Sequence, residues 1–159
     1  SSARAVEERL REKAERKGLA LLVEVEPAEL EIVTDASSLE AVIVNLVDNA
    51  LSYTEAGEVR LRLRPHSGAG ALLLVQDTGP GIDPEVLPRI FERFFRGDPA
   101  RSRASGGTGL GLSIVRNLVG RMGGRIAVRN RPGEGTLFRV ELPANPARPL
   151  AGAGQASFA

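Results

Sequence analysis

The 159-residue sequence contains no cysteine and no tryptophan, and His66 is its only histidine. Without cysteine, the chain has no disulfide framework, no thiolate metal site and no thiol nucleophile. It also lacks an apolar run as long as a membrane-spanning helix, and its charged first residues, SSARAVEERLREKAERKG, differ from a secretory signal peptide. These absences indicate a soluble domain of a reducing or redox-indifferent compartment.

An excess of charge of one sign is also missing, because 21 basic and 20 acidic residues give a formal net charge of +1. Such a chain has no overall field that attracts nucleic acid or an anionic membrane. It has no basic patch interleaved with aromatic residues, which make up only 4% of the chain. We therefore expect no nucleic-acid partner.

The first predicted element is a helix that ends near Lys17. Its apolar stripe is thin and repeats every four residues, at Val6, Leu10 and Ala14. The helix is either solvated or the end of a longer helical hairpin or coiled coil. Two short strands, LALLVEVE and LEIVTD, follow on either side of Pro27.

A second helix is predicted from Ser37 to Tyr53, where apolar residues recur at steps of three and four. It has two candidate N-terminal caps, a capping box of Ser37 with Glu40 and the side chain of Asp35. Two β-hairpins are predicted further on, GEVRLRLR with ALLLVQD and GRIAVRN with GTLFRVEL. A short helix is expected between these hairpins, over residues 84–91.

This order of elements predicts an α/β (α+β) two-layer sandwich, with about three helices on one face of a mixed, mainly antiparallel sheet. Residues 144–159 are rich in proline, alanine and glycine, and we expect them to be disordered. The folded domain is therefore expected to span residues 19–143.

Glycine is concentrated in the stretch GGTGLGLS, directly before a helix with a clear apolar stripe. Backbone N–H groups without a neighbouring Cβ approach phosphate closely, and a helix N-terminus adds partial positive charge. The stretch is neither a Walker A loop nor a G-x-G-x-x-G motif. A flexible connector without a ligand is the alternative interpretation.

A second glycine turn, DTGPGID, follows a predicted buried strand, with Asp77 at the end of that strand. A carboxylate at this position accepts a hydrogen bond from the amino group of adenine, whereas the carbonyl oxygen of guanine repels it. The alternative is an ordinary turn in which the aspartate bonds the local backbone.

Asn45, Asn49 and Tyr53 are four residues apart and share one face of the second helix. Amide oxygens suit Mg²⁺, which keeps most of its waters and takes few protein ligands. A tyrosine ring at the end of this row packs against a base. The alternative interpretation is a wet polar helix face.

In this order, NLVDNALSYT, DTGPGI, FERFFR and GGTGLGLSIV resemble the ATP-binding catalytic domain of bacterial sensor histidine kinases, in the GHKL ATPase superfamily with its Bergerat-type fold. The resemblance extends from about residue 5 to residue 143. It implies that the chain binds ATP and Mg²⁺. It also implies transfer of the γ-phosphoryl group to a histidine of a dimerisation domain, and from there to a response regulator.

The resemblance also implies roles for individual residues. Asn49 is the Mg²⁺ ligand, and Asn45 lies near the triphosphate and positions the nucleophile. The adenine side is formed by Tyr53, Asp77, Gly79, Gly81, Ile82 and Thr136. The phosphates are surrounded by Gly107, Thr108, Gly109, Leu110, Gly111 and Leu112, and Arg96 is the candidate phosphate-binding catalytic side chain. Phe91, Phe94 and Phe95 connect the nucleotide lid to the core.

Two features depart from the family pattern. Ser52 stands where the family often has a basic residue that meets phosphate, and Arg96 and Arg101 are the substitutes we consider. His66 lies in the predicted loop PHSGAG and is expected to be an exposed loop residue rather than a phosphate acceptor. The acceptor domain is therefore expected on another segment, joined through residues 1–18, and this chain is not expected to phosphorylate itself.

The resemblance further implies a monomer for the isolated domain and a homodimer for the full-length protein. It implies a cytoplasmic location, within a membrane-anchored sensor kinase. Three alternatives stay open: an anti-sigma-type serine kinase, another GHKL ATPase, and a non-catalytic GHKL module. The FERFFR box counts against the serine kinase, because such kinases usually lack it.

Overall fold

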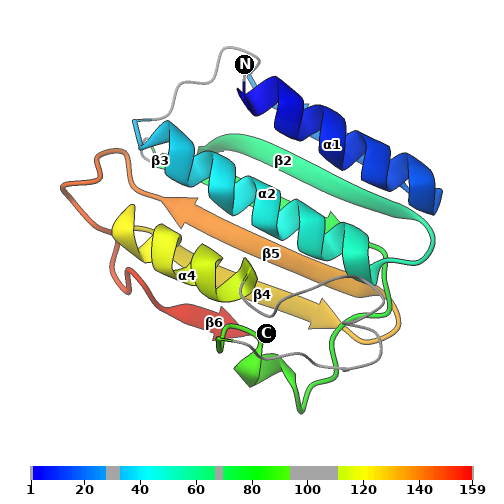
Figure 1. Ribbon diagram of the computed structural model, residues 1–159. Coiled ribbons are helices and arrows are strands. Elements are labelled where there is room, and N and C mark those ends of the chain that lie inside the picture. Colours follow the sequence, from blue (N-terminus) through cyan, green and yellow to red (C-terminus); the bar gives the residue numbers. More distant parts are fainter. Residues whose placement is uncertain (1, 28–32, 67–69, 94–110, 159) are drawn as a thin grey trace.

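The computed structural model describes residues 2–27, 33–66, 70–93 and 111–158 (Figure 1). The elements in chain order are α1 (Ser2–Lys17), β1 (Ala20–Val25), α2 (Ala36–Tyr53), β2 (Glu58–His66), β3 (Gly70–Asp77), the 3₁₀ turn η1 (Leu87–Arg89), α4 (Gly111–Arg121), β4 (Arg125–Arg131), β5 (Gly135–Leu142) and β6 (Ala156–Phe158).

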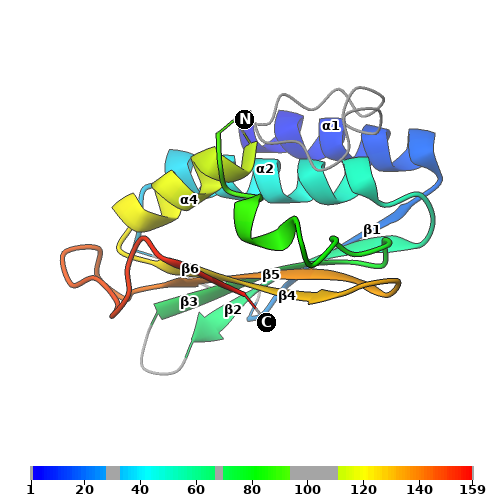
Figure 2. The ribbon, with the colours of Figure 1, turned by 90° about the horizontal axis from the view of Figure 1, so that it is seen from below.

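The strands form one sheet in the order β1-β2-β3-β5-β4-β6. The four central strands pair antiparallel, whereas the edge strands β1 and β6 pair parallel to β2 and β4. Helices α1, α2 and α4 lie side by side on one face of this sheet (Figure 2). The predicted two-layer α/β sandwich with a mixed, mainly antiparallel sheet is confirmed.

The core lies between the helices and the sheet. Side chains alternate between the two faces of a strand, so every second residue of β3 and β5 points toward the helices. Leu73 and Val140 are fully buried there, in the same core cluster as Leu46 of α2. On α1, Leu10 and Ala14 are only 7% and 2% exposed, so this helix belongs to the same core. The interpretation of α1 as a solvated helix is therefore wrong.

Two lysines of α1 connect it to α2. Lys17 donates from Nζ to the backbone oxygens of Leu51 and Ser52. These carbonyls lie in the last turn of α2, where a cation interacts favourably with the helix dipole. One turn earlier on α1, Lys13 Nζ lies 2.8 Å from Asp48 Oδ1 and 2.7 Å from Ser52 Oγ.

Helix α2 begins at Ala36, with Asp35 as its N-cap. The Asp35 carboxylate accepts hydrogen bonds from the Ser37 backbone N–H and from the Ser38 hydroxyl. Of the two candidate caps, Asp35 is therefore the one that the structure uses. The hydrogen bonds from Ser38 and Ser37 lower the pKa of Asp35 below its usual range.

We expect Asp35→Ala to lower the thermal unfolding midpoint at neutral pH, because the N-terminal N–H groups of α2 lose their acceptor. A lowered carboxyl pKa stabilises the fold above the pKa of the unfolded chain, and this contribution is lost as the pH falls through the folded-state pKa. Melting curves at pH 7 and at about pH 2 should therefore differ between variant and parent only at pH 7. Asp35→Asn is the control that keeps a cap. An equal deficit at both pH values would show that capping is not the cause.

The C-terminal segment corrects the predicted disorder of residues 144–159. Through residue 158 it is ordered, and β6 pairs parallel to β4, with Ala156 opposite Ile126. The Leu150 and Gly154 backbone N–H groups donate to the carbonyls of Gly123 and Gly124. The backbone of β4 would otherwise be an unpaired sheet edge, and the segment covers it. The prediction of disorder used composition alone, and composition does not show that β4, which is distant in the sequence, pairs with this segment.

Two smaller expectations also change. The helix expected over 84–91 is reduced to the 3₁₀ turn of η1, with Pro88 at its start. His66 is the last residue of β2, and its Nε2 lies 3.3 Å from Glu141 Oε2 with 25% of the side chain exposed, so it is not an exposed loop residue. Of the second predicted strand, LEIVTD, residues 30–32 lie outside the described residues, and residues 33–35 are not part of a strand.

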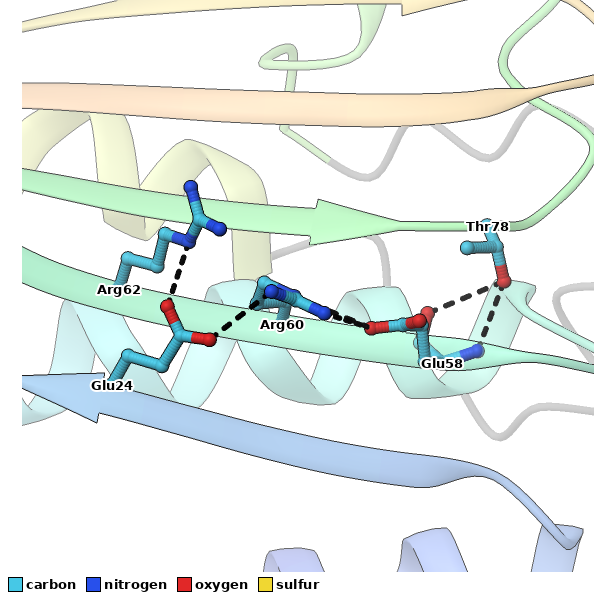
Figure 3. Close-up of polar contacts among 5 residues, drawn as sticks. All are labelled: Glu24, Glu58, Arg60, Arg62 and Thr78. Carbon is cyan, nitrogen blue, oxygen red and sulfur yellow. Dashed lines mark hydrogen bonds and ion pairs between the residues drawn. The ribbon is translucent and has the colours of Figure 1, made fainter.

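The sheet face opposite the helices carries arginines that pair with glutamates across strands. On β1 and β2, Glu24 accepts from both Arg60 and Arg62, and Arg60 also binds Glu58 (Figure 3). On β5, Glu141 is nearly buried and binds Arg125 and Arg139. Burial raises the pKa of Glu141, but the Arg125 hydrogen bond and the positive charges nearby outweigh it and lower this pKa.

Candidate nucleotide-binding site

Asp77 is the last residue of β3 and lies opposite Val59, which is fully buried beneath the helices. Paired residues of adjacent strands share a face, so Asp77 points to the helix side of the sheet. Its Oδ1 accepts the Gly79 N–H at 2.9 Å and the Thr136 N–H at 3.3 Å. Its Oδ2 has no donor among the described residues, so half of the carboxylate is held by backbone and half remains available.

Burial raises the pKa of Asp77, although the hydrogen bonds from the Gly79 and Thr136 backbones act in the opposite direction. A carboxyl that loses water on burial favours its neutral form. A ligand that donates a hydrogen bond to such a carboxylate stabilises its ionised form.

Both glycines of the DTGPGID turn lie against neighbouring backbone or side chains. A Cβ on Gly79 would lie 3.0 Å from Asp77 Oδ1 and 3.2 Å from Thr54 Oγ1. A Cβ on Gly81 would lie 2.8 Å from the backbone oxygen of Arg131. A side chain at Gly81 would therefore displace the turn, and one at Gly79 would press on the Asp77 and Thr54 side chains.

Asn130 of β4 holds this turn from the opposite side. Its Oδ1 accepts the Ile82 N–H at 2.7 Å and the Thr136 hydroxyl at 3.2 Å, and its Nδ2 donates to the backbone oxygen of Ile82. Sequence reasoning missed Asn130. The available signal was an amide on the helix side of a strand whose other residues on that side, Ile126 and Val128, are apolar and buried.

The polar row of α2 extends along the site, and all three of its predicted residues are half-buried. At the C-terminal end, a Cβ on Gly79 would lie 3.4 Å from the backbone oxygen of Tyr53. At the other end, a Cβ on Gly111, the first residue of α4, would lie 3.2 Å from Asn45 Oδ1. The row therefore connects the Asp77 turn to the N-terminus of α4, with Asn49 between them.

The two asparagines differ in their hydrogen bonds. Asn45 donates from Nδ2 to the Ala41 carbonyl of its own helix at 2.7 Å, which orients its side-chain oxygen. The Asn49 amide has no hydrogen bond to any described residue. The described part of the chain also contains no cluster of three or more acidic or histidine side chains that could hold a metal ion. The amide oxygen of Asn49 is the kind of hard ligand that suits Mg²⁺, an ion that takes few protein ligands.

One buried polar atom beside the turn lacks a partner. Thr54 is completely buried, and its hydroxyl has no hydrogen bond among the described residues. Its distance to the Gly79 position places this hydroxyl next to Asp77. Gly79 is itself buried, so the available Asp77 oxygen is the polar group of this turn that a flat, polar heterocycle would meet, with the unpartnered Thr54 hydroxyl behind it.

Several predicted site residues lie outside the described residues. These are Arg96, Arg101, Phe94, Phe95, Gly107, Thr108, Gly109 and Leu110. Phe91 is described, and its ring meets Phe138 edge to face at 6.4 Å, so the chain is bound to the core just before this stretch. Leu112 packs against the core as the second residue of α4.

The family of this chain follows from comparison with known proteins. Residues 34–146 match the model of the histidine kinase-, DNA gyrase B- and HSP90-like ATPases. This match covers more than half of the chain, which therefore belongs to that family. The resemblance to the ATP-binding catalytic domain of sensor histidine kinases is confirmed.

Two of the similar proteins are sensor kinases of known name. The chain is 45% identical over 118 residues to the sensor-like histidine kinase SenX3 of Mycobacterium tuberculosis, covering 74% of this chain and 29% of SenX3. It is 40% identical over 146 residues to the autoinducer 2 sensor kinase/phosphatase LuxQ of Vibrio parahaemolyticus, covering 88% of this chain and 17% of LuxQ. The chain thus spans less than a third of these relatives.

Solved structures agree with this assignment. The nucleotide-free catalytic domain of histidine kinase ThkA superposes with a TM-score of 0.76 at 30% identity, and 91% of each chain is covered. Full-length ShkA in complex with AMPPNP gives a TM-score of 0.75 at 35% identity, covering 89% of this chain and 29% of ShkA. Within the described residues of our chain, no helix is both long and apolar enough to cross a membrane.

Proposed function

We propose that this chain binds ATP with Mg²⁺ and acts as the ATP-binding catalytic domain of a two-component sensor histidine kinase. The observation that carries the proposal is the division of the Asp77 carboxylate. Oδ1 is held by two backbone N–H groups, and Oδ2 is left for the amino group of adenine. Guanine presents a carbonyl oxygen in place of that amino group, so the same oxygen repels it.

The remaining contacts follow the polar row of α2. Tyr53 packs on the base, with Gly79, Gly81, Ile82 and Thr136 around it. Asn49 is a ligand of Mg²⁺, which neutralises charge on the phosphates. Asn45 and the N-terminus of α4 at Gly111 and Leu112 lie at the phosphate end. Arg96 and the glycine stretch 107–110 complete this end in the proposal.

The chemistry assigned to this domain is mainly positioning. Phosphoryl transfer depends on alignment and charge neutralisation more than on covalent participation of the protein. The described residues supply an oriented amide at Asn45, a hard oxygen ligand at Asn49 and a base-selective carboxylate at Asp77. The proposed reaction is transfer of the γ-phosphoryl group to a histidine nitrogen.

His66 does not serve as that acceptor. It is the last residue of β2 and pairs with Gly70 at the start of β3, whereas Asp77 is at the other end of β3. Seven residues of extended chain separate these ends by about 23 Å. We therefore place the acceptor histidine on a dimerisation domain of a longer, homodimeric and membrane-anchored kinase, with this domain in the cytoplasm and a response regulator as the final acceptor.

Titration calorimetry with ATP and GTP, each with and without Mg²⁺, tests the binding. We expect adenine-selective binding, roughly micromolar to sub-millimolar in dissociation constant, that Mg²⁺ strengthens. Asn49→Ala should remove most of the Mg²⁺-dependent gain, because it removes the only amide oxygen assigned to the ion. Equal binding of the two nucleotides would contradict the proposed base recognition.

Incubation with labelled ATP tests the reaction. The purified chain alone should acquire no stable label, whereas a separately purified acceptor domain of a relative should acquire phosphohistidine. Stable label on this chain alone, or acid-stable phosphoserine on a partner, would contradict the proposed histidine kinase.

A further inference from the structure

A basic side chain is absent from the row of α2 that faces the proposed nucleotide. Residues spaced by three, four and seven along a helix share one face. Asn45, Asp48, Asn49 and Ser52 have this spacing and therefore form a single stripe. The stripe itself carries one acid and no cation, although it extends along the proposed phosphate end.

A cation reaches this stripe from the neighbouring helix. Lys13 of α1 extends its ammonium group to two members of the stripe, Asp48 Oδ1 at 2.8 Å and Ser52 Oγ at 2.7 Å. The other two members are the asparagines assigned to Mg²⁺ and the phosphates. The ammonium therefore contacts the residue directly before Asn49 and the residue three positions after it.

The packing of α1 against the core and α2 holds Lys13 in place. Ala14 is buried in the core next to it, and Lys17 binds the last carbonyls of α2 one turn further on. Only 23% of the Lys13 side chain is exposed, so solvent screens its charge incompletely. An ammonium group has three N–H donors, and the two bonds to α2 leave one for a further acceptor.

We infer that Lys13 supplies the positive charge for the phosphates of the bound nucleotide, in place of the basic side chain that Ser52 does not provide. This inference rests on the proposed function, since it concerns the phosphate end of the same site. The serine leaves space over α2, and its hydroxyl binds the ammonium that occupies the space. Asp48 lies beside the same ammonium and weakens its field at the phosphates.

The test compares ligands with and without phosphates on matched variants. Calorimetry with adenosine, ADP and ATP in Mg²⁺ is carried out on the parent chain, Lys13→Met and Lys17→Met. We expect Lys13→Met to weaken ATP binding about tenfold, with a smaller loss for ADP, and to leave adenosine within about twofold. Lys17→Met also removes a lysine bond between the two helices, and it should weaken none of the ligands selectively.

Three further substitutions separate charge from packing. Lys13→Arg should keep the ATP affinity, and Ser52→Lys should restore it in the Lys13→Met background. Asp48→Asn should strengthen ATP binding several-fold both in the parent chain and in the Lys13→Met background, because the carboxylate repels the phosphates with or without the lysine. The ATP affinity of the parent should also fall more steeply with salt than that of Lys13→Met.

The outcomes distinguish this inference from the proposed function. If the parent chain binds neither ATP nor adenosine, the proposed function fails and the inference with it. If the parent binds ATP and Lys13→Met binds it equally well, only the inference is overturned. Equal weakening of ATP and adenosine by Lys13→Met would also overturn it, because Lys13 would then only connect the two helices.

Discussion

Replacing Asp77 with asparagine is expected to abolish most ATP binding while the fold remains intact. Asparagine keeps an oxygen that accepts the Gly79 and Thr136 N–H groups, so the turn retains its backbone hydrogen bonds. The other side-chain atom becomes an NH₂ group, which opposes the amino group of adenine donor to donor. The loss of a charge-assisted bond and the new conflict together should weaken ATP binding by about 100-fold.

Calorimetric titration at neutral pH measures this loss, and thermal melting measures the fold. Asp83→Asn is the matched control, because Asp83 lies in the same turn but uses its carboxylate for the Glu85 backbone N–H. The control should bind ATP like the parent. Unchanged ATP affinity in Asp77→Asn would refute the assignment of Oδ2 to adenine, and a large drop in melting temperature would mean that Asp77 is mainly structural.

The stability of Asp77→Asn follows from the direction of the pKa shift. Burial raises the pKa of Asp77, so the folded state disfavours its carboxylate at neutral pH. Removing that charge should leave the free energy of unfolding unchanged or slightly higher. For ATP affinity the loss of the charge is unfavourable, because the ionised carboxylate is the better hydrogen-bond acceptor for adenine. ATP affinity should therefore decrease as the pH falls through the raised pKa, and should do so before an ordinary aspartate becomes protonated.

The sequence predicts the fold correctly where the periodicity of a segment favours the same conformation that packing against the core stabilises. The alternation in β2 and β5, the three- and four-residue steps in α2 and the glycine turn after β3 each identify their own element. The spacing of Asn45, Asn49 and Tyr53 also places them on one face without tertiary information. Local periodicity is a sufficient guide there, because the core stabilises the same conformation that the residues favour.

Long-range contacts account for what sequence reasoning missed. Asn130 is separated from Ile82 by 48 residues, and Lys13 from Ser52 by 39. No local pattern relates such residues, since the contacts exist only after β4 and α1 have packed. The same cause explains β6, whose composition resembles a disordered tail until the edge of β4 supplies its hydrogen-bond partners.

At the junction between β3 and β5, adding one methyl group to the site should cause the largest loss of stability. Gly135 has a φ of 135°, and a Cβ there would lie 2.1 Å from the backbone oxygen of Asp77. Gly135→Ala must therefore push the start of β5 away from the end of β3. We expect the free energy of unfolding to fall by about 3 kcal/mol or more, from steric overlap and an unfavourable backbone conformation together.

Gly133→Ala is the matched control for this prediction, two residues away in the same β4–β5 turn. Gly133 also has a positive φ, 82°, but a Cβ there would meet no atom within 4 Å. It should cost only the left-handed backbone penalty, about 1 kcal/mol. Denaturant unfolding of the two variants measures the difference. If both lose the same stability, backbone conformation alone is the cause, and the close approach of Gly135 to Asp77 contributes nothing. If Gly135→Ala loses more, ATP binding should decrease with it, because displacing β5 removes the Thr136 N–H that orients the Asp77 carboxylate.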